Sequence, residues 1–178
     1  MSGLLPKIFK SKTPVPVAIA QYERDDFSVG NEHELHWAII AVTHTEKEEF
    51  KGPMWQATDR LYSDGRPKQW SISQSAEVSL CRTMKCLGGV VIGYISGKDI
   101  EKLNKLILEG ARPNPKFHGW NCRDWIVEVI RSILIPNGWA NEAFTTQKSL
   151  LPFMRTAAQA SALARQQYKR PMPKLVFA

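Results

Sequence analysis

A cysteine lies where a helix is expected to begin. In the stretch HGWNCRDWIVEVIRSIL, residues 118–134, Asn121 is a suitable N-cap, and Asp124, three positions later, can complete a capping box. This pattern places Cys122 at the first helical position, beside backbone amides that have no partner within the helix. Because such amides stabilise negative charge, we expect the thiol to have a pKa below its ordinary value of about 8.5. A thiol of this kind can act as a nucleophile.

The position alone does not separate a reactive thiol from a structural one. Free cysteine is among the most buried residue types and often serves as a small hydrophobe. The helix expected after Cys122 has an apolar inward face made of Trp125, Ile126, Val129, Ile130, Ile133 and Leu134. We expect Gly119 to allow a close approach of the backbone near the thiol. A reactive thiol also needs a base, and a histidine is available upstream.

That histidine is His36, which begins the stretch HWAIIAV at residues 36–42. The stretch is a nearly continuous apolar run with charge on both sides, which predicts a strand buried on both faces. Alternation places Ala38 on the same face as His36, and Trp37 on the other face. The small side chain of Ala38 leaves room beside the imidazole. A strand-edge histidine that faces water is the alternative interpretation.

The elements around these residues predict a mixed α+β domain. Residues 55–62 and 70–75 are interpreted as antiparallel strands joined by a turn at 63–67, and residues 15–22 as a possible start of the sheet. Residues 88–95 are interpreted as a further buried strand or a close-packed glycine passage. Residues 79–87 are ambiguous. Helices are expected at 99–108, from 121 to Pro136, and within 149–168. We therefore expect one domain over residues 1–178, an α+β fold with an antiparallel sheet packed against the Cys122 helix, an irregular arm at 1–14 and a tail at 170–178.

The composition indicates a folded protein of a reducing compartment. Of the 178 residues, 43% are hydrophobic, enough for a proper core. The longest apolar run is far shorter than the roughly 20 residues of a membrane span, so no transmembrane segment is expected. The first residues lack the apolar block and cleavage site of a secretion signal. An odd number of widely spaced cysteines, three in all, predicts free thiols and a cytoplasmic location.

Charge and motifs predict neither nucleic-acid binding nor a cofactor. The formal net charge of +7 is spread along the chain, with a modest concentration at residues 148–174, and no DNA- or RNA-binding pattern accompanies it. Cys81 and Cys86, taken with His33 and His36, lack the closely paired spacing of a structural zinc site. The stretch GYISGKD lacks the Ser or Thr of a phosphate-binding loop. We expect no metal ion and no other cofactor.

The two motifs together resemble those of the circularly permuted members of the NlpC/P60 papain-like superfamily, which include the lecithin:retinol acyltransferase-like proteins and the PPPDE peptidases. The resemblance rests on HWAIIAV and NCRDWIVEVI, since in these families the histidine precedes an Asn-Cys pair that opens a helix packed on the sheet. It implies a papain-like fold and a cysteine hydrolase, thiol protease or acyltransferase acting on an amide, isopeptide, ester or thioester bond. The third histidine of the lecithin:retinol type has no counterpart, because His44 follows the first strand too closely.

The resemblance also implies roles for individual residues. Cys122 would be the nucleophile, and His36 the base that takes the thiol proton and later protonates the leaving group. A third polar residue that orients the imidazole is expected on the next strand, where the candidates are Gln56, Thr58 and Asp59. Gln56 is favoured because its side-chain oxygen can accept a hydrogen bond from the imidazole.

The surroundings of the thiol complete the predicted site. The backbone N–H of Cys122 is expected to donate to an oxyanion during acyl transfer. The expected substrate-binding residues are Trp120, His118, Asn121 and Trp37. Trp120 would line a groove, whereas His118 would either shape the pocket or simply lie in the loop. The expected partner is a peptide, lipid or small-molecule acyl substrate.

Two interpretations from other classes stay open. The chain could be a non-catalytic binding or structural protein on the same fold, with an idle thiol, because a fold does not fix a function. It could also be an anion-binding module that uses the basic C-terminal segment, whose affinity would fall steeply with salt.

Overall fold

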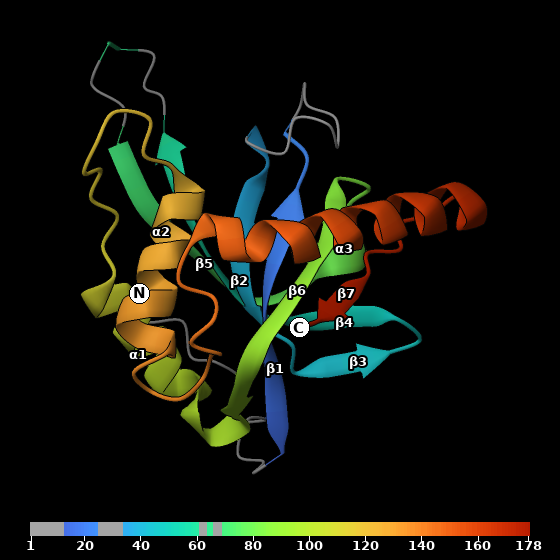
Figure 1. Ribbon diagram of the computed structural model, residues 1–178, viewed down its shortest axis with the longest axis horizontal. Helices are drawn as coiled ribbons and strands as arrows, with labels where there is room; N and C mark the ends of the chain where they lie inside the picture. Colours follow the sequence, from blue (N-terminus) through green and yellow to red (C-terminus); the bar gives the residue numbers. More distant parts are fainter. Residues whose placement is uncertain (1–12, 25–33, 61–63, 66–68) are drawn as a thin grey trace.

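The computed structural model describes residues 13–24, 34–60, 64–65 and 69–178, and within them seven strands form one curled sheet (Figure 1). The sheet order is β3-β4-β2-β1-β6-β7, with β5 paired to β4. The strands are β1 (Pro14–Tyr22), β2 (His36–Ala41), β3 (His44–Glu46), β4 (Glu49–Arg60), β5 (Gln69–Ser79), β6 (Cys86–Ser96) and β7 (Leu175–Phe177). The described pairs are antiparallel apart from β6 with β7, which is parallel. The predicted α+β class is confirmed.

The helices pack against this sheet (Figure 1). They are α1 (Ile100–Gly110), α2 (Cys122–Val129) and α3 (Gln147–Tyr168), with the short 3-10 segments η3 (Leu80–Arg82) and η4 (Gly97–Asp99) and the π-helical segment η5 (Ile130–Leu134). α2 packs on β2 and β4, and α3 packs on β6. The η5 segment continues α2 directly, so the helix that begins at Cys122 runs to Leu134 as predicted. Among the described helices, none is both long and apolar enough to cross a membrane.

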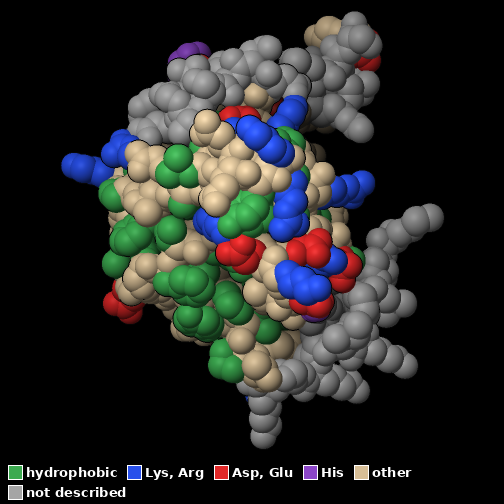
Figure 2. All heavy atoms as spheres, turned by 90° about the vertical axis from the view of Figure 1, so that its right-hand side faces the viewer, with side chains coloured by type: hydrophobic (Ala, Val, Ile, Leu, Met, Phe, Trp, Pro, Cys, Tyr) green, Lys and Arg blue, Asp and Glu red, His purple; other side chains and the backbone are tan. Residues whose placement is uncertain are grey.

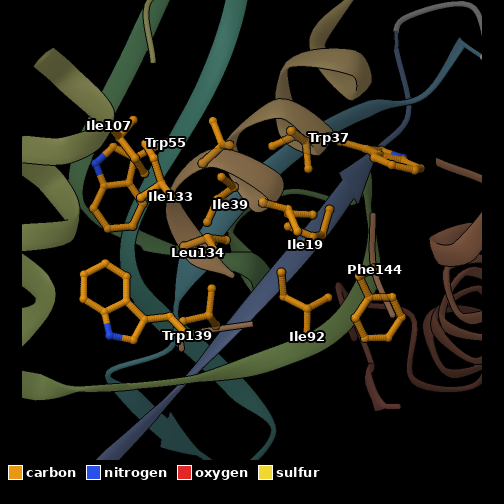
Figure 3. Close-up of a cluster of buried hydrophobic side chains, with 14 of the residues drawn as sticks. Ile19, Trp37, Ile39, Trp55, Ile92, Ile107, Ile133, Leu134, Trp139 and Phe144 are labelled. Atoms are coloured by element: carbon orange, nitrogen blue, oxygen red, sulfur yellow. The ribbon is translucent and has the colours of Figure 1, made fainter. Parts of the chain in front are cut away.

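The two faces of the sheet hold two separate hydrophobic clusters. The cluster beneath the helices contains large side chains, including Ile19, Trp37, Ile39, Trp55, Ile92, Leu134 and Trp139 (Figure 3). The opposite cluster combines the alanines Ala18, Ala20 and Ala38 of β1 and β2 with larger side chains such as Ile40 and Met54. Residues of β1 and β2 therefore alternate between the clusters, as the period of a strand requires. This alternation confirms the prediction that 36–42 is buried on both faces.

Some elements extend beyond their predicted bounds. β4 starts six residues before the strand predicted at 55–62, and the turn predicted at 63–67 lies partly outside the described residues. The tail predicted at 170–178 instead carries β7, which is held by hydrogen bonds from Gly89 N to Lys174 O (3.0 Å) and from Lys174 N to Ser161 Oγ (2.8 Å). A three-residue strand is too short for an alternation pattern, which is why the sequence did not reveal it. Of the arm predicted at 1–14, residues 1–12 lie outside the described part, and Pro14 begins β1.

Candidate active site

The N-terminus of α2 is built by the capping box that the sequence predicts. Asn121 adopts an extended conformation, and its Oδ1 accepts a hydrogen bond from Arg123 N at 3.0 Å. In return, Asn121 N donates to Asp124 Oδ2 at 3.0 Å. Cys122 is therefore the first residue of α2, as predicted, and its side chain is buried, with 1% of the residue exposed.

One contact and one backbone conformation fix the chain on either side of the thiol. Gln147 Nε2, at the start of α3, donates to Asp124 Oδ1 at 2.6 Å and so ties the beginnings of α2 and α3 together. Before the thiol, Gly119 has φ +86°, a left-handed conformation that favours glycine. The expectation that Gly119 permits a close backbone approach is wrong, because a Cβ built there would meet nothing within 4 Å. Glycine is required at this position by its dihedral angle.

We predict that Asn121→Ala lowers the free energy of unfolding by about 1 kcal/mol, because the first turn of α2 loses its cap. Urea denaturation followed by circular dichroism measures the change. Asn114→Ala is the matched control, since Asn114 is exposed in the preceding loop and no hydrogen bond to it is found in the described part of the chain. Equal stability of the two variants would contradict the stabilising role of the cap.

His36 is hydrogen-bonded to both other members of the predicted triad. It is the first residue of β2, and its Nε2 lies 2.7 Å from Gln56 Oε1 on β4. Its ring is also hydrogen-bonded to the thiol of Cys122. Because a side-chain amide oxygen only accepts, Nε2 must carry a hydrogen, and Nδ1 is left as the nitrogen that can take the thiol proton.

Strand alternation alone would have separated the thiol from the imidazole. Cys122 packs in the cluster that contains Trp37, whereas Ala38, which shares the expected face of His36, packs in the opposite cluster. The two groups meet because β2 and α2 both begin at the same end of the sheet (Figure 1). For the contact with Cys122, the position of His36 as the first residue of β2 therefore matters as much as the face on which its side chain lies.

The pKa values of the thiol and the imidazole are shifted toward the charged forms of both. Burial raises the pKa of the Cys122 thiol, but hydrogen bonds from His36 and from the backbone of Trp37, with the charges of His36 and Arg24, outweigh burial and lower it below the ordinary value. Burial lowers the pKa of His36, but its interactions with Cys122 and its hydrogen bond to Gln56 outweigh burial and raise it. Both shifts favour the thiolate of Cys122 beside the imidazolium of His36.

The other two cysteines differ from Cys122. All three are free thiols. Burial, with a smaller contribution from the charge of Cys81, raises the pKa of Cys86 to about 12, although the hydroxyl of Tyr22 partly opposes the shift. Burial and the nearby carboxylate of Glu49 raise the pKa of Cys81. A thiol whose pKa is lowered therefore coexists with two thiols whose pKa values are raised, which gives the protein internal controls for reactivity.

Gln56 is the third-residue candidate whose side chain contacts the imidazole. It follows Trp55, which pairs with Ile39 of β2, and it is half-buried. Thr58 and Asp59 lie further along β4 and are also half-buried. The structure thus brings Cys122, His36 and Gln56 into one hydrogen-bonded chain.

The expected substrate-binding residues differ in their accessibility. Trp120 is buried, its Nε1 donates to Glu128 Oε1 at 3.0 Å and its ring packs edge-on against Trp70, so it belongs to the core and does not line an open groove. His118 is exposed in the loop before α2. Asn121 is half-buried and serves as the cap.

Trp37 is buried, and its indole N–H has no hydrogen-bond partner among the described residues. The guanidinium of Arg123 lies 5.9 Å from the centre of its ring, which places the Trp37 side chain beside the first turn of α2. An unpaired buried donor is costly unless a ligand or water supplies an acceptor.

Arg24 is a contributor that the sequence did not reveal. Its charge lowers the pKa of both Cys122 and His36. Arg24 follows β1 by two residues, and Tyr22 at the end of β1 pairs with His36. Only knowledge of this strand pairing would have placed Arg24 near the site.

The described residues hold no group of three or more His, Cys, Asp or Glu side chains that could bind a metal ion. His33, considered with the cysteines in the sequence, lies outside these residues. On the face seen from the right-hand side of Figure 1, acidic side chains lie among the basic ones (Figure 2). The positive charge on that face is therefore not gathered into one continuous patch.

Comparison with known proteins places the chain in a family. No curated protein and no solved structure matches it. The sequence model of one family matches residues 16–151, which run from β1 to the start of α3 and include Cys122, His36 and Gln56. Because this match covers more than half of the chain, the protein belongs to the family of unknown function DUF6914.

Proposed function

We propose that this protein is a cysteine-dependent hydrolase or acyltransferase in which Cys122, His36 and Gln56 form the catalytic chain. The observation that carries the proposal is the hydrogen-bonded series from thiol to imidazole to amide, with the pKa of Cys122 lowered and that of His36 raised. A nucleophile, a base and a residue that orients the base are the parts that thiol-dependent acyl transfer requires.

We further propose that the fold is of the permuted NlpC/P60 papain-like type. Two features support this assignment. The histidine-bearing strand precedes the cysteine-bearing helix in the chain, and that helix packs on an antiparallel part of the sheet. The capped Asn-Cys start of α2 agrees with the motif on which the resemblance rests.

In the proposed reaction, the Cys122 thiolate attacks the carbonyl carbon of the substrate and forms a C–S bond. The backbone N–H of Cys122 and the unpaired indole N–H of Trp37 are the donors available to the developing oxyanion. The bond to the leaving group breaks as the His36 imidazolium gives it a proton. Water or another acceptor then attacks the thioester, His36 takes its proton, and the C–S bond breaks to restore the thiolate.

The test of this proposal is the detection of an acyl-enzyme. Because Cys122 is only 1% exposed, the acyl donor should be small, and p-nitrophenyl acetate is suitable. After an acid quench, peptide mass analysis should find the acetyl group on Cys122 while Cys81 and Cys86 stay unmodified, and the acetyl group should be lost again on longer incubation. Acetylation of Cys81 without Cys122 would contradict the proposal and would favour a non-catalytic protein with an idle thiol.

We predict that Gln56→Leu and Gln56→Glu shift the pKa of His36 in opposite directions. Leucine removes the hydrogen bond that raises this pKa, so the value should fall, whereas a carboxylate stabilises the imidazolium and should raise it. An NMR titration of the imidazole C–H signals measures the shift, and His44 and His118, both exposed, serve as internal references.

Because the imidazole stabilises the thiolate, the alkylation rate of Cys122 near neutral pH should also change in these variants. The change should be about tenfold for a shift of one unit in the pKa of the thiol. If both variants left the His36 titration unchanged, Gln56 would not be the residue that orients the base.

A further inference from the structure

A cavity of about 620 Å³ lies between the end of α1, the loop at 111–116 and the helix formed by α2 and η5. Cys122, His36 and Gln56 do not line it, so it is separate from the candidate active site. Its volume is in the range of roughly 300–1,000 Å³ that is typical of small-molecule sites.

The apolar part of the cavity is held in place by hydrogen bonds. The half-buried Ala111 contributes to it, and Trp125 and Val129 of α2 lie behind it, both almost completely buried. Trp125 Nε1 donates to the carbonyl oxygen of Ala111 at 2.7 Å, and Ala111 N donates to Ile107 O at 3.0 Å. These bonds tie α2 to the end of α1, so this wall exists without a ligand, as is usual for binding sites.

The rim of the cavity is basic, and two of its charges are unpaired. Arg112, Lys116 and Arg131 line it, against one acidic residue, Glu128. Glu128 is already engaged by Lys116 Nζ at 3.2 Å and by Trp120 Nε1 at 3.0 Å. Neither the Arg112 nor the Arg131 side chain has an ion pair or hydrogen bond within the described part of the chain. Planar guanidinium groups that lack a protein partner are well suited to binding carboxylate or phosphate oxygens.

The η5 segment supplies part of this rim. Arg131 and Ser132 belong to its π-helical turn, and Ser132 Oγ donates to the Glu128 carbonyl at 2.7 Å. π-helical turns are rare and occur frequently at functional sites. The irregular turn therefore coincides with the cavity and with one of its two unpaired arginines.

We propose that this cavity binds a small molecule that carries an oxyanion, a carboxylate or a phosphate, through Arg112 and Arg131, while an apolar part of the ligand packs against Ala111. The proposal is independent of the thiol chemistry, because the two sites share no lining residue. The site would take one ligand of modest size, which agrees with the volume of the cavity.

The test uses phenyl phosphate and benzoate as probes, with benzyl alcohol as an uncharged analogue, at constant ionic strength. Backbone amide NMR shifts should change at residues 125–132 and at the non-proline residues of 110–116 on addition of at least one anionic probe. The double variant Arg112→Ser/Arg131→Ser should weaken binding at least about tenfold, the loss typical of removing charge-assisted hydrogen bonds. The matched control is Arg82→Ser/Arg170→Ser, which removes two exposed arginine charges elsewhere and should bind as the wild type does.

Each outcome decides the proposal. Binding of phenyl phosphate alone identifies a phosphate ligand, and binding of benzoate alone identifies a carboxylate ligand; both support the site. If the two double variants weakened binding of the probe equally, the probe would be attracted only by the net charge of the protein, and the proposal would be overturned. Equal binding of benzyl alcohol, or no binding of any probe to the folded wild type, would overturn it as well.

Discussion

Replacement of Cys122 by alanine is expected to abolish acyl transfer while the fold is retained. The thiolate is the group that forms the covalent intermediate, and removal of a covalent nucleophile costs a factor of about 10³ or more in kcat. Release of p-nitrophenol beyond the spontaneous rate measures the loss. Circular dichroism and thermal unfolding establish that the variant is folded.

Cys81→Ala is the matched control for this experiment. Cys81 is a half-buried thiol on η3 whose pKa is raised, so its removal should leave the rate unchanged. Full activity of Cys122→Ala would show that another group carries the reaction. If Cys122→Ala fails to fold but Cys122→Ser folds normally, the side chain at this position has a packing role. Inactivity of the folded serine variant would then show that the thiol is also needed for catalysis.

The second large effect is expected for His36→Ala. The imidazole is what overcomes the effect of burial on Cys122, so without it the pKa of the buried thiol should rise above the ordinary thiol value. The thiolate present near neutral pH should then nearly vanish, and turnover should fall by about 10²- to 10⁴-fold because the general base is also lost.

The ultraviolet absorbance of the thiolate as a function of pH measures the His36→Ala shift without requiring access to the buried sulfur. The matched control is His44→Ala, because His44 is exposed on β3. An unchanged titration of Cys122 in His36→Ala would mean that the imidazole does not set the thiol pKa, and the helix N-terminus would then be the main cause.

The start of α2 could be predicted because its signals are local. Asn121 and Asp124 form the predicted capping box, and the inward face from Trp125 to Leu134 follows from helical periodicity. The buried strand at residues 36–42 was equally clear from its composition. These features depend only on neighbours in the sequence.

The geometry of the site depends on pairings that the sequence does not encode locally. The sequence offered Gln56, Thr58 and Asp59 as third residues and favoured Gln56 only by its chemistry, because the choice among them depends on how β4 lies beside β2. The charge of Arg24 acts on the site because β1 pairs with β2.

The cavity beside α2 could not be predicted from the sequence for a similar reason. Arg112, Lys116 and Arg131 are too far apart in the sequence to form a basic block, and they meet only when α1 and its following loop pack beside η5. The turn that carries Arg131 is π-helical, a distinction that hydrophobic periodicity does not make.

The central claim, that Cys122 is an activated thiol, is tested most directly by the pH dependence of iodoacetamide alkylation at each cysteine, read by peptide mass. We predict that Cys122 reacts first, with a midpoint below the ordinary thiol pKa, that Cys81 follows at higher pH, and that Cys86, whose pKa is about 12, stays unreactive in the folded protein. A Cys122 that is alkylated only after the protein unfolds, or only with the midpoint of an ordinary thiol, would contradict the claim.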